Sequence, residues 1–215
     1  MKRDESEMAY HGYIPFIAEY LAHFNRCTIL EIGVNTGIST FALVSRLDKR
    51  NQHFTYLGVD ILIRPDVVET IKYMGLNDIS NVMLSQSNSL QALDDLVKQN
   101  VKFDVILLDG DHNYYTVSRE LPQIDLLMHE NTLLVADDYK GKWSSRDLYY
   151  GDNEEYRDNT IATKRKDVQI DADQKQGVQP AIDEFLLERK HLRSGFLMEG
   201  EPIMIWNERN KIING

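Results

Sequence analysis

The chain alternates short apolar runs with longer segments in which apolar residues recur at every third or fourth position. Short runs between polar stops are typical of buried strands, and the longer spacing indicates amphipathic helices. Strands are expected at 28–32, 54–60, 81–85, 103–108 and 132–136. Helices are expected at 10–25, 36–47, 66–74, 90–97, 116–128 and 177–187. A final pair of strands, 195–198 and 202–206, is expected to form a hairpin around a turn at 199–201.

This order predicts the fold class. Strands that alternate with helices five times are typical of an α/β protein with a doubly wound, mostly parallel sheet, whose ligands lie beyond the carboxyl ends of the strands. The terminal hairpin adds an antiparallel edge, which makes seven strands in a single domain of 215 residues. Within it we expect an N-terminal covering helix on the sheet edge (1–27), a cofactor-binding core (28–139), a mobile lid or substrate loop (140–176), and a C-terminal helix with the hairpin (177–215).

A glycine turn follows the first strand. Its pattern is Glu31-x-Gly33-x-x-x-Gly37, with Asn35 where a dinucleotide fingerprint would have a middle glycine. The turn leads into a helix, whose first N–H groups are free to face a ligand. An acid at the end of the strand suits a ligand with a cationic amine. A nicotinamide oxidoreductase would use the same strand, turn and helix, but the glycine spacing argues against it.

Asp60 ends the second expected strand. An acid at this place after a glycine turn is typical of a carboxylate that binds the hydroxyls of a ribose. An aspartate that ends a strand can instead cap a turn. We expect ribose binding, with capping as the alternative.

Acidic residues also end the fourth and fifth expected strands. They are Asp109 and Asp111, with His112 beside them, and the pair Asp137 and Asp138. Neighbouring parallel strands would bring these carboxylates together, and their repulsion must be offset by a raised pKa, a basic partner or a cation. Carboxylate oxygens suit Mg²⁺, with Ca²⁺ or Mn²⁺ as substitutes. The alternative is that each pair caps a turn.

These motifs resemble a known family. The acid-x-Gly-x-x-x-Gly turn is similar to the first motif of class I S-adenosylmethionine-dependent methyltransferases, which have a Rossmann-like fold. Asp109-Gly-Asp-His-x-Tyr followed by Asp137-Asp-Tyr resembles the metal-dependent O-methyltransferases, including the macrocin and aminocoumarin sugar enzymes. A cephalosporin hydroxylase-like branch shares these turns. The resemblance covers residues 28–139.

The resemblance implies roles for individual residues. Asp109, Asp137 and Asp138 would hold Mg²⁺, and Asp111 or His112 would be the catalytic base. Ser39 would touch the methionine carboxylate, and Asn88 and Ser89 would lie beside the adenine unless they serve only to begin a helix. The full set of expected cofactor-binding residues is Glu31, Gly33, Asn35, Gly37, Ser39, Asp60, Asn88, Ser89 and Asp109.

Composition narrows the classes of partner. The formal net charge of −10 argues against a nucleic-acid partner, and the basic run at 164–166 is short and flanked by acids. No apolar run approaches membrane-spanning length and the N-terminus carries no signal pattern, so we expect no membrane partner and a cytoplasmic location. The polar segment 140–176 contains four aromatic residues that we expect to close over a substrate: Trp143, Tyr149, Tyr150 and Tyr156. The alternative is that this segment is disordered.

The expected function is methyl transfer from S-adenosylmethionine to a hydroxyl of a small molecule, assisted by a divalent metal. The alternatives are a non-catalytic module that binds a nucleotide or a partner, and a nicotinamide oxidoreductase. The sequence does not decide the oligomeric state, and a homo-oligomer is compatible with it.

Overall fold

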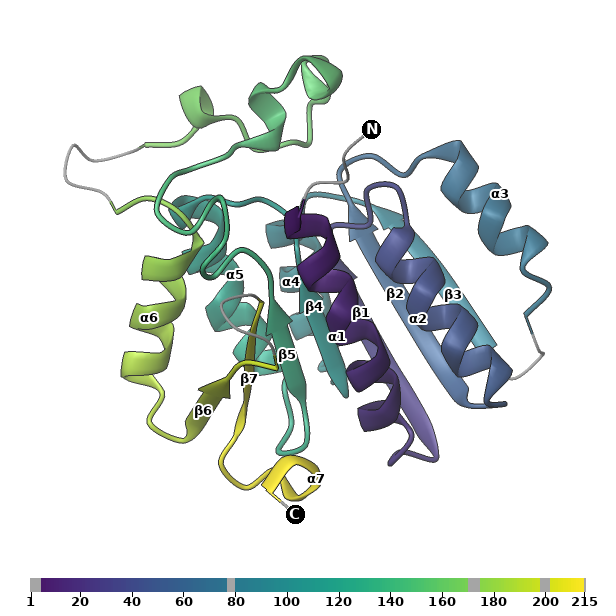
Figure 1. The fold of residues 1–215 in the computed structure, drawn as a ribbon. Helices are drawn as coiled ribbons and strands as arrows, with labels where there is room; N and C mark the ends of the chain where they lie inside the picture. Colours follow the sequence, from purple (N-terminus) through teal and green to yellow (C-terminus); the bar gives the residue numbers. More distant parts are fainter. Residues whose placement is uncertain (1–4, 77–79, 170–174, 198–201, 215) are drawn as a thin grey trace.

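A seven-stranded sheet forms the centre of the protein (Figure 1). The computed structural model describes residues 5–76, 80–169, 175–197 and 202–214, with side chains from residue 12 onward. The strands are β1 (Arg26–Ile32), β2 (His53–Asp60), β3 (Ser80–Gln86), β4 (Val105–Leu108), β5 (Leu133–Ala136), β6 (Leu192–Gly195) and β7 (Ile203–Asn207). The helices are α1 (Glu5–Leu21), α2 (Ile38–Lys49), α3 (Pro65–Tyr73), α4 (Ser89–Lys98), α5 (Tyr114–Leu127), α6 (Val178–Glu188) and α7 (Lys211–Asn214).

The strand order is β3-β2-β1-β4-β5-β7-β6. Strands β1 to β5 pair in parallel, whereas β7 runs antiparallel to both β5 and β6. The predicted doubly wound sheet with an antiparallel edge is therefore confirmed. From β1 the chain adds β2 and β3 on one side, and it then returns to add β4 and β5 on the other side. In such a sheet a ligand crevice forms between the carboxyl ends of the two strands at this reversal, here β1 and β4.

Helices cover both faces of the sheet. Helices α4, α5 and α6 pack on one face, and α1, α2 and the short α7 on the other (Figure 1). The N-terminal helix was expected at the sheet edge, and this expectation was wrong. Ile14 and Ile17 of α1 share a core with Leu107 of β4 and Val135 of β5. The central strands are apolar on both faces, and both faces must therefore be covered. Helix α2 covers only part of the face on which it packs, and α1 covers the rest.

The terminal hairpin is shifted along the chain from its predicted position. Its first strand was expected at 195–198, but β6 ends at Gly195, which pairs with Met204. The expected turn, 199–201, lies outside the described residues. Phe196 follows the strand and packs on the ring of Tyr139, with 5.8 Å between ring centroids. Phe196 is apolar because it packs on Tyr139, and not because it belongs to a strand. The sequence pattern counted it as a strand residue and so misplaced the strand.

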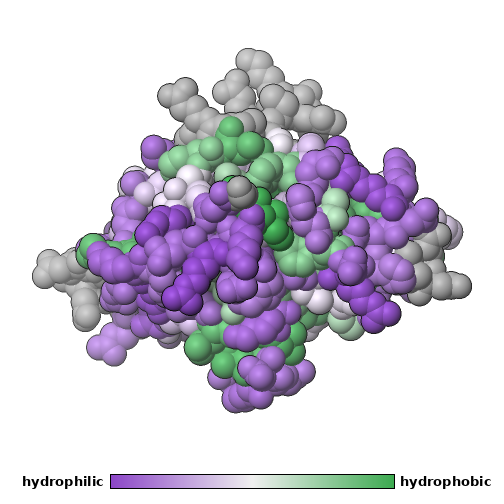
Figure 2. All heavy atoms as spheres, turned by 90° about the horizontal axis from the view of Figure 1, so that it is seen from below, coloured by the Kyte–Doolittle hydropathy of each residue, from purple (hydrophilic) through white to green (hydrophobic). Residues whose placement is uncertain are grey.

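The segment between β5 and α6 crosses over the carboxyl ends of the strands (Figure 1). It contains three short 3₁₀ helices, η1 (Tyr150–Asp152), η2 (Glu154–Tyr156) and η3 (Arg165–Asp167). The face seen from below in Figure 1, opposite this segment, is mostly hydrophilic, with apolar residues gathered in separate areas (Figure 2). In the described parts of the chain, no helix has the length and apolar character to cross a membrane.

Candidate functional site

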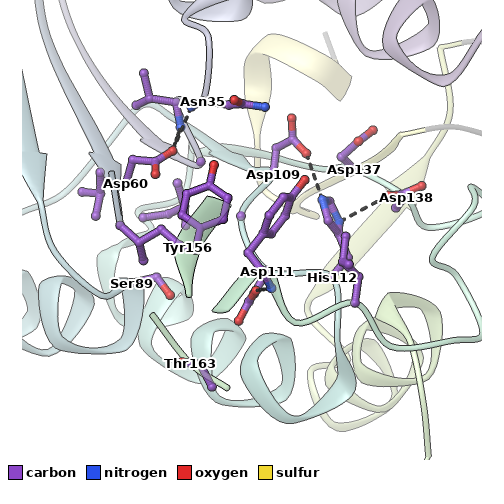
Figure 3. Close-up of a pocket in the computed structure, with 18 of the residues that line it drawn as sticks. Asn35, Asp60, Ser89, Asp109, Asp111, His112, Asp137, Asp138, Tyr156 and Thr163 are labelled. Carbon is purple, nitrogen blue, oxygen red and sulfur yellow. Dashed lines mark hydrogen bonds and ion pairs between the residues drawn. The ribbon is translucent and has the colours of Figure 1, made fainter. Parts of the chain in front are cut away.

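A cavity of about 590 Å³ lies at the carboxyl ends of the central strands. Its walls come from the turns after β1, β2, β3, β4 and β5, and the segment 142–163 closes it from above. This is the position that the reversal between β1 and β4 predicts for a ligand site. The volume is in the range of pockets that hold small molecules and cofactors. In Figure 3, Asn35 and Asp60 lie on one side, and Asp109, His112, Asp137 and Asp138 gather on the other.

The glycine turn after β1 is held against the end of β4. Gly33 has φ +93°, and a Cβ at this position would lie 1.9 Å from the carbonyl oxygen of Asp109. Gly37 has φ +74° at the start of α2, and Asn35 is also left-handed, with φ +46°. Gly33 and Asn35 line the cavity, while Gly37 does not. The first glycine therefore allows two strand ends to meet, and the second forms the turn into the helix.

Glu31 lies behind this turn, outside the cavity wall. Its side chain is fully buried and accepts hydrogen bonds from the hydroxyls of Ser39, Thr40 and Tyr56, the last at 2.6 Å. Burial raises the pKa of this carboxyl above its ordinary value, and the three hydroxyls oppose that rise. Glu31 thus ties the turn to α2 and β2, and the structure does not place it against a ligand amine as expected. Ser39 does line the cavity, but its hydroxyl proton is directed to Glu31.

Asp60 lines the cavity and also organises the glycine turn. Its Oδ2 atom accepts hydrogen bonds from the backbone N–H groups of Val34 and Asn35, both at 2.8 Å. Its Oδ1 atom accepts from the N–H of Leu62 at 2.9 Å. The capping alternative is therefore present in the structure. A carboxylate can accept about four hydrogen bonds, so three backbone donors leave capacity for a ligand hydroxyl.

Asn88 connects the core to the overlying segment. Its Oδ1 atom accepts from the N–H of Leu90 and so caps α4. Its Nδ2 group donates to the carbonyl of Ile161 and to Oγ1 of Thr163, both at 3.0 Å. Asn88 and Ser89 line the cavity as expected. Asn88 therefore caps α4, as the alternative held, and also makes an unexpected contact with the overlying segment.

Glu120 is a buried acid that the sequence reasoning missed. It lies on α5 and is 0% exposed, and neither carboxylate oxygen has a hydrogen-bond partner among the described residues. Burial raises its pKa to about 8, although nearby Ser89 favours the charged form. The available signal was its place on the apolar stripe of the helix, between Val117 and Ile124.

The acids at the ends of β4 and β5 do come together, with His112 between two of them. The Nε2 atom of His112 lies 3.5 Å from Oδ1 of Asp109, and its Nδ1 atom lies 3.3 Å from Oδ2 of Asp138 (Figure 3). Burial is the main reason that the pKa of Asp109 is raised well above its ordinary value, and the neighbouring Asp137 adds to the rise. Burial also lowers the pKa of His112, while Asp138 acts in the opposite direction.

Asp111 points away from this cluster (Figure 3). Its Oδ1 atom accepts from the N–H of Tyr150 at 3.0 Å, and its Oδ2 atom accepts from Oγ1 of Thr116 at 3.2 Å. Burial raises the pKa of Asp111 to about 6. Of the two residues expected as the base, only His112 lies among the acids, while Asp111 fastens the overlying segment.

The expected metal ligands do not converge on one point. Asp109, Asp137 and Asp138 have the oxygen donors that Mg²⁺ prefers. Within the described ranges, however, no group of three or more His, Cys, Asp or Glu side chains is arranged to hold a metal ion. The imidazole of His112 lies between Asp109 and Asp138, so these residues do not fit a metal ion as they are arranged.

Aromatic residues of the overlying segment form part of the cavity wall. Trp143, Tyr150 and Tyr156 line it, and the rings of Tyr150 and His112 have centroids 5.9 Å apart. Tyr149 is instead buried, and its hydroxyl has no hydrogen-bond partner in the part of the chain that the structure describes. The segment is also fixed from the β2 side, where Asn159 Nδ2 donates to the carbonyl of Ile61 at 2.8 Å.

Comparison with known proteins identifies the family. A family model described as a methyltransferase domain matches residues 30–139, just over half of the chain. Comparison with curated proteins gives no match.

Solved structures show the same fold at low sequence identity. The apo structure of CalS11, a TDP-rhamnose 3′-O-methyltransferase of calicheamicin biosynthesis, has a TM-score of 0.58 and 13% identity, over 93% of this chain and 79% of that chain. The SAH-bound Podospora anserina methyltransferase PaMTH1 has a TM-score of 0.54 and 18% identity, over 93% and 78%. The MycE methyltransferase of the mycinamycin pathway, in complex with Mg and SAH, has a TM-score of 0.53 and 14% identity, over 98% and 56%. With the glycine turn, the acids at the strand ends and the matched region in agreement, the chain belongs to the methyltransferase-domain family and has the class I S-adenosylmethionine-dependent methyltransferase fold.

Proposed function

We propose that the protein transfers a methyl group from S-adenosylmethionine to a hydroxyl of a small molecule, with His112 as the general base. The observation that carries this proposal is the position of the His112 imidazole between Asp109 and Asp138, in the same cavity as the glycine turn and Asp60. One cavity then holds both the cofactor site and a proton acceptor.

The cofactor would lie along the crevice from β4 to β3. Its methionine part would meet the turn at Gly33 and Asn35, where backbone N–H groups can face a carboxylate. A ribose hydroxyl would donate a further hydrogen bond to the carboxylate of Asp60. The adenine would lie near Asn88 and Ser89. This arrangement directs the methyl group toward the side of the cavity that holds His112.

The reaction needs one proton transfer and one displacement. His112 Nε2 accepts the proton of the acceptor hydroxyl while Nδ1–H faces Asp138, a tautomer that we infer from the two carboxylates. The hydroxyl oxygen attacks the methyl carbon, and the electrons of the S–C bond return to sulfur, which leaves S-adenosylhomocysteine. Asp138 stabilises the imidazolium that forms. Because both side chains are buried, this stabilisation is stronger than it would be in water.

The comparisons support parts of this proposal. Membership in the methyltransferase-domain family supports the reaction class. CalS11 is described as a sugar O-methyltransferase, and PaMTH1 and MycE were solved with SAH, which supports the acceptor chemistry and the cofactor. The absence of a nucleic-acid partner stays a prediction from the charge of the chain.

Metal assistance is a separate prediction. A divalent ion would polarise the acceptor hydroxyl and lower its pKa. To hold one, Asp109, Asp137 and Asp138 would have to draw together and His112 would have to move aside. The presence of Mg in the MycE complex is the reason to test this.

We also infer that the segment 140–169 acts as a lid. It supplies Trp143, Tyr150 and Tyr156 to the cavity wall, and it is joined to the core through Asn88 and Asp111. Excluding water would favour the methyl transfer, because the positions of the reacting groups decide most of its rate.

The experiment is a transfer assay with S-adenosylmethionine labelled on its methyl group and a panel of small hydroxyl compounds. The assay is run with Mg²⁺ and with EDTA. The proposal predicts labelled product that is lost in His112→Asn, and a rate unchanged by EDTA would remove the metal from the mechanism. Cofactor binding without transfer to any compound would favour the non-catalytic module, and binding of NAD in its place would favour the oxidoreductase.

A further inference from the structure

Three exposed cations follow β5 in the chain, and one of them, Lys142, lines the cavity. They are Lys140, Lys142 and Arg146, which we call the basic rim. The ion pairs found among the described residues include none of these three side chains. By contrast, Arg64 is paired with Glu155, and Arg189 is paired with Asp125.

The rim is built around the ring of Trp143. The Nζ atom of Lys142 lies 4.9 Å from the ring centroid, and the Cζ atom of Arg146 lies 4.7 Å from it. The backbone of Trp143 is fixed between two elements, because its carbonyl accepts from Val178 of α6 at 3.0 Å and its N–H donates to Asp138 at 3.5 Å. The two cations are thus positioned by the fold, close to the residue that we place beside the base.

Trp143 lines the cavity beside Lys142. The other charged residues of the cavity wall are acids, and the protein has a net charge of −10. Neighbouring cations without counter-ions repel one another, so a bound anion would stabilise the rim. The Nε atom of Arg146 donates to the carbonyl of Lys142 at 2.9 Å. The two terminal NH₂ groups of such a guanidinium still match the oxygens of a phosphate.

We propose that the acceptor carries a phosphate or diphosphate group, which Lys142 and Arg146 bind at the cavity mouth while its hydroxyl faces His112. This inference rests on the proposed function and specifies its substrate class. Lys140 adds charge from the side of Phe196, over whose ring its Nζ atom lies at 4.9 Å.

A simpler role for Lys142 would be to offset the charge of the acids in the cavity. That role predicts that the wild type does not bind added pyrophosphate, and that Arg146→Ala has no effect, because Arg146 is not part of the cavity wall. The proposal predicts that both cations are required. The two single variants therefore separate an anion site from a counter-ion.

The experiment is calorimetric titration of inorganic pyrophosphate into the protein saturated with S-adenosylhomocysteine. We expect saturable binding that weakens about tenfold in Lys142→Ala and in Arg146→Ala, the effect of losing one charge-assisted contact. Lys166→Ala removes the same charge from an exposed site elsewhere in the segment and should leave the affinity unchanged. Unchanged melting temperatures in all three variants would show that the folds are intact.

The proposal is overturned if the wild type does not bind pyrophosphate, or if Lys166→Ala weakens binding as much as the rim variants do. It is also overturned if Arg146→Ala binds as tightly as the wild type. Binding of S-adenosylhomocysteine is measured first in the same cell. Failure there contradicts the proposed function, whereas cofactor binding without pyrophosphate binding contradicts only the inference about the acceptor.

Discussion

The Nδ1 atom of His112 lies 3.3 Å from Oδ2 of Asp138, although the two residues follow different strands. Asp138 reaches this position with φ +56°, in the left-handed region that few residues other than glycine adopt. Local strain of this kind is found where the surrounding structure holds a functional group in place. We therefore expect Asp138 to orient the imidazole of His112.

Replacing His112 with asparagine should lower kcat by about 10²- to 10⁴-fold, the usual contribution of a general base. Affinity for S-adenosylmethionine should stay close to that of the wild type, because the glycine turn and Asp60 are untouched. Steady-state kinetics with cofactor titration measures both quantities. His191→Asn is the matched control on an exposed histidine, and a His112 variant as active as this control would contradict the assigned role.

Replacing Asp138 with asparagine separates its charge from its conformation. Asparagine tolerates the left-handed region, so the backbone turn should persist. Without the carboxylate the imidazolium loses its partner, and we expect kcat to fall at least about tenfold. The measurement is kcat beside the melting temperature. A fall in both quantities together would instead mean that Asp138 acts through stability.

Gly33→Ala should destabilise the protein by several kcal/mol, since the new Cβ would lie 1.9 Å from a backbone carbonyl that cannot move freely. Gly75 is the matched control: it also has positive φ, +57°, but a Cβ there would meet none of the described residues within 4 Å. Gly75→Ala should cost only about 1–2 kcal/mol, the strain of a left-handed alanine. Urea unfolding of both variants gives the comparison, and equal losses would rule out the clash.

Glu120 should make stability depend on pH. Its pKa is about 8 in the folded protein and about 4.3 when unfolded, so the folded state holds a proton that the unfolded state releases between these values. Stability due to this group is therefore full below about pH 4 and is lost as pH rises toward 8. Glu120→Gln removes the titration, and its stability relative to wild type should rise by at least about 1.4 kcal/mol over this window.

Thermal unfolding between pH 4 and 8 measures this difference. Glu69→Gln, at an exposed position, is the control and should follow the wild type at every pH. A constant offset between Glu120→Gln and wild type would show that the buried carboxyl is charged in both states.

The fold followed from the sequence because its strongest signals are local. Apolar runs predicted β1 to β5, and the glycines at 33 and 37 predicted the turn that leads into α2. The hairpin was misplaced because the apolar Phe196 was taken as a strand residue. It packs instead on Tyr139, a contact that depends on the tertiary structure. Pattern alone does not distinguish these two reasons for an apolar residue.

The site was predictable as a set of residues but not as a set of contacts. Strand ends gather at one edge of a parallel sheet, so Asp60, Asp109 and His112 were expected to meet there. The direction of each side chain depends on packing, which placed the carboxylate of Glu31 behind the turn and that of Asp111 against the backbone of Tyr150. The partners of Asn88 could not be foreseen, because they come from a segment without periodicity.

Calorimetric titration with S-adenosylmethionine and, separately, with NAD shows which cofactor the cavity binds. We expect saturable binding of one S-adenosylmethionine per chain, with no binding of NAD at the same concentrations. Binding of NAD, or binding of neither compound, would contradict the assignment of this cavity to a methyl donor.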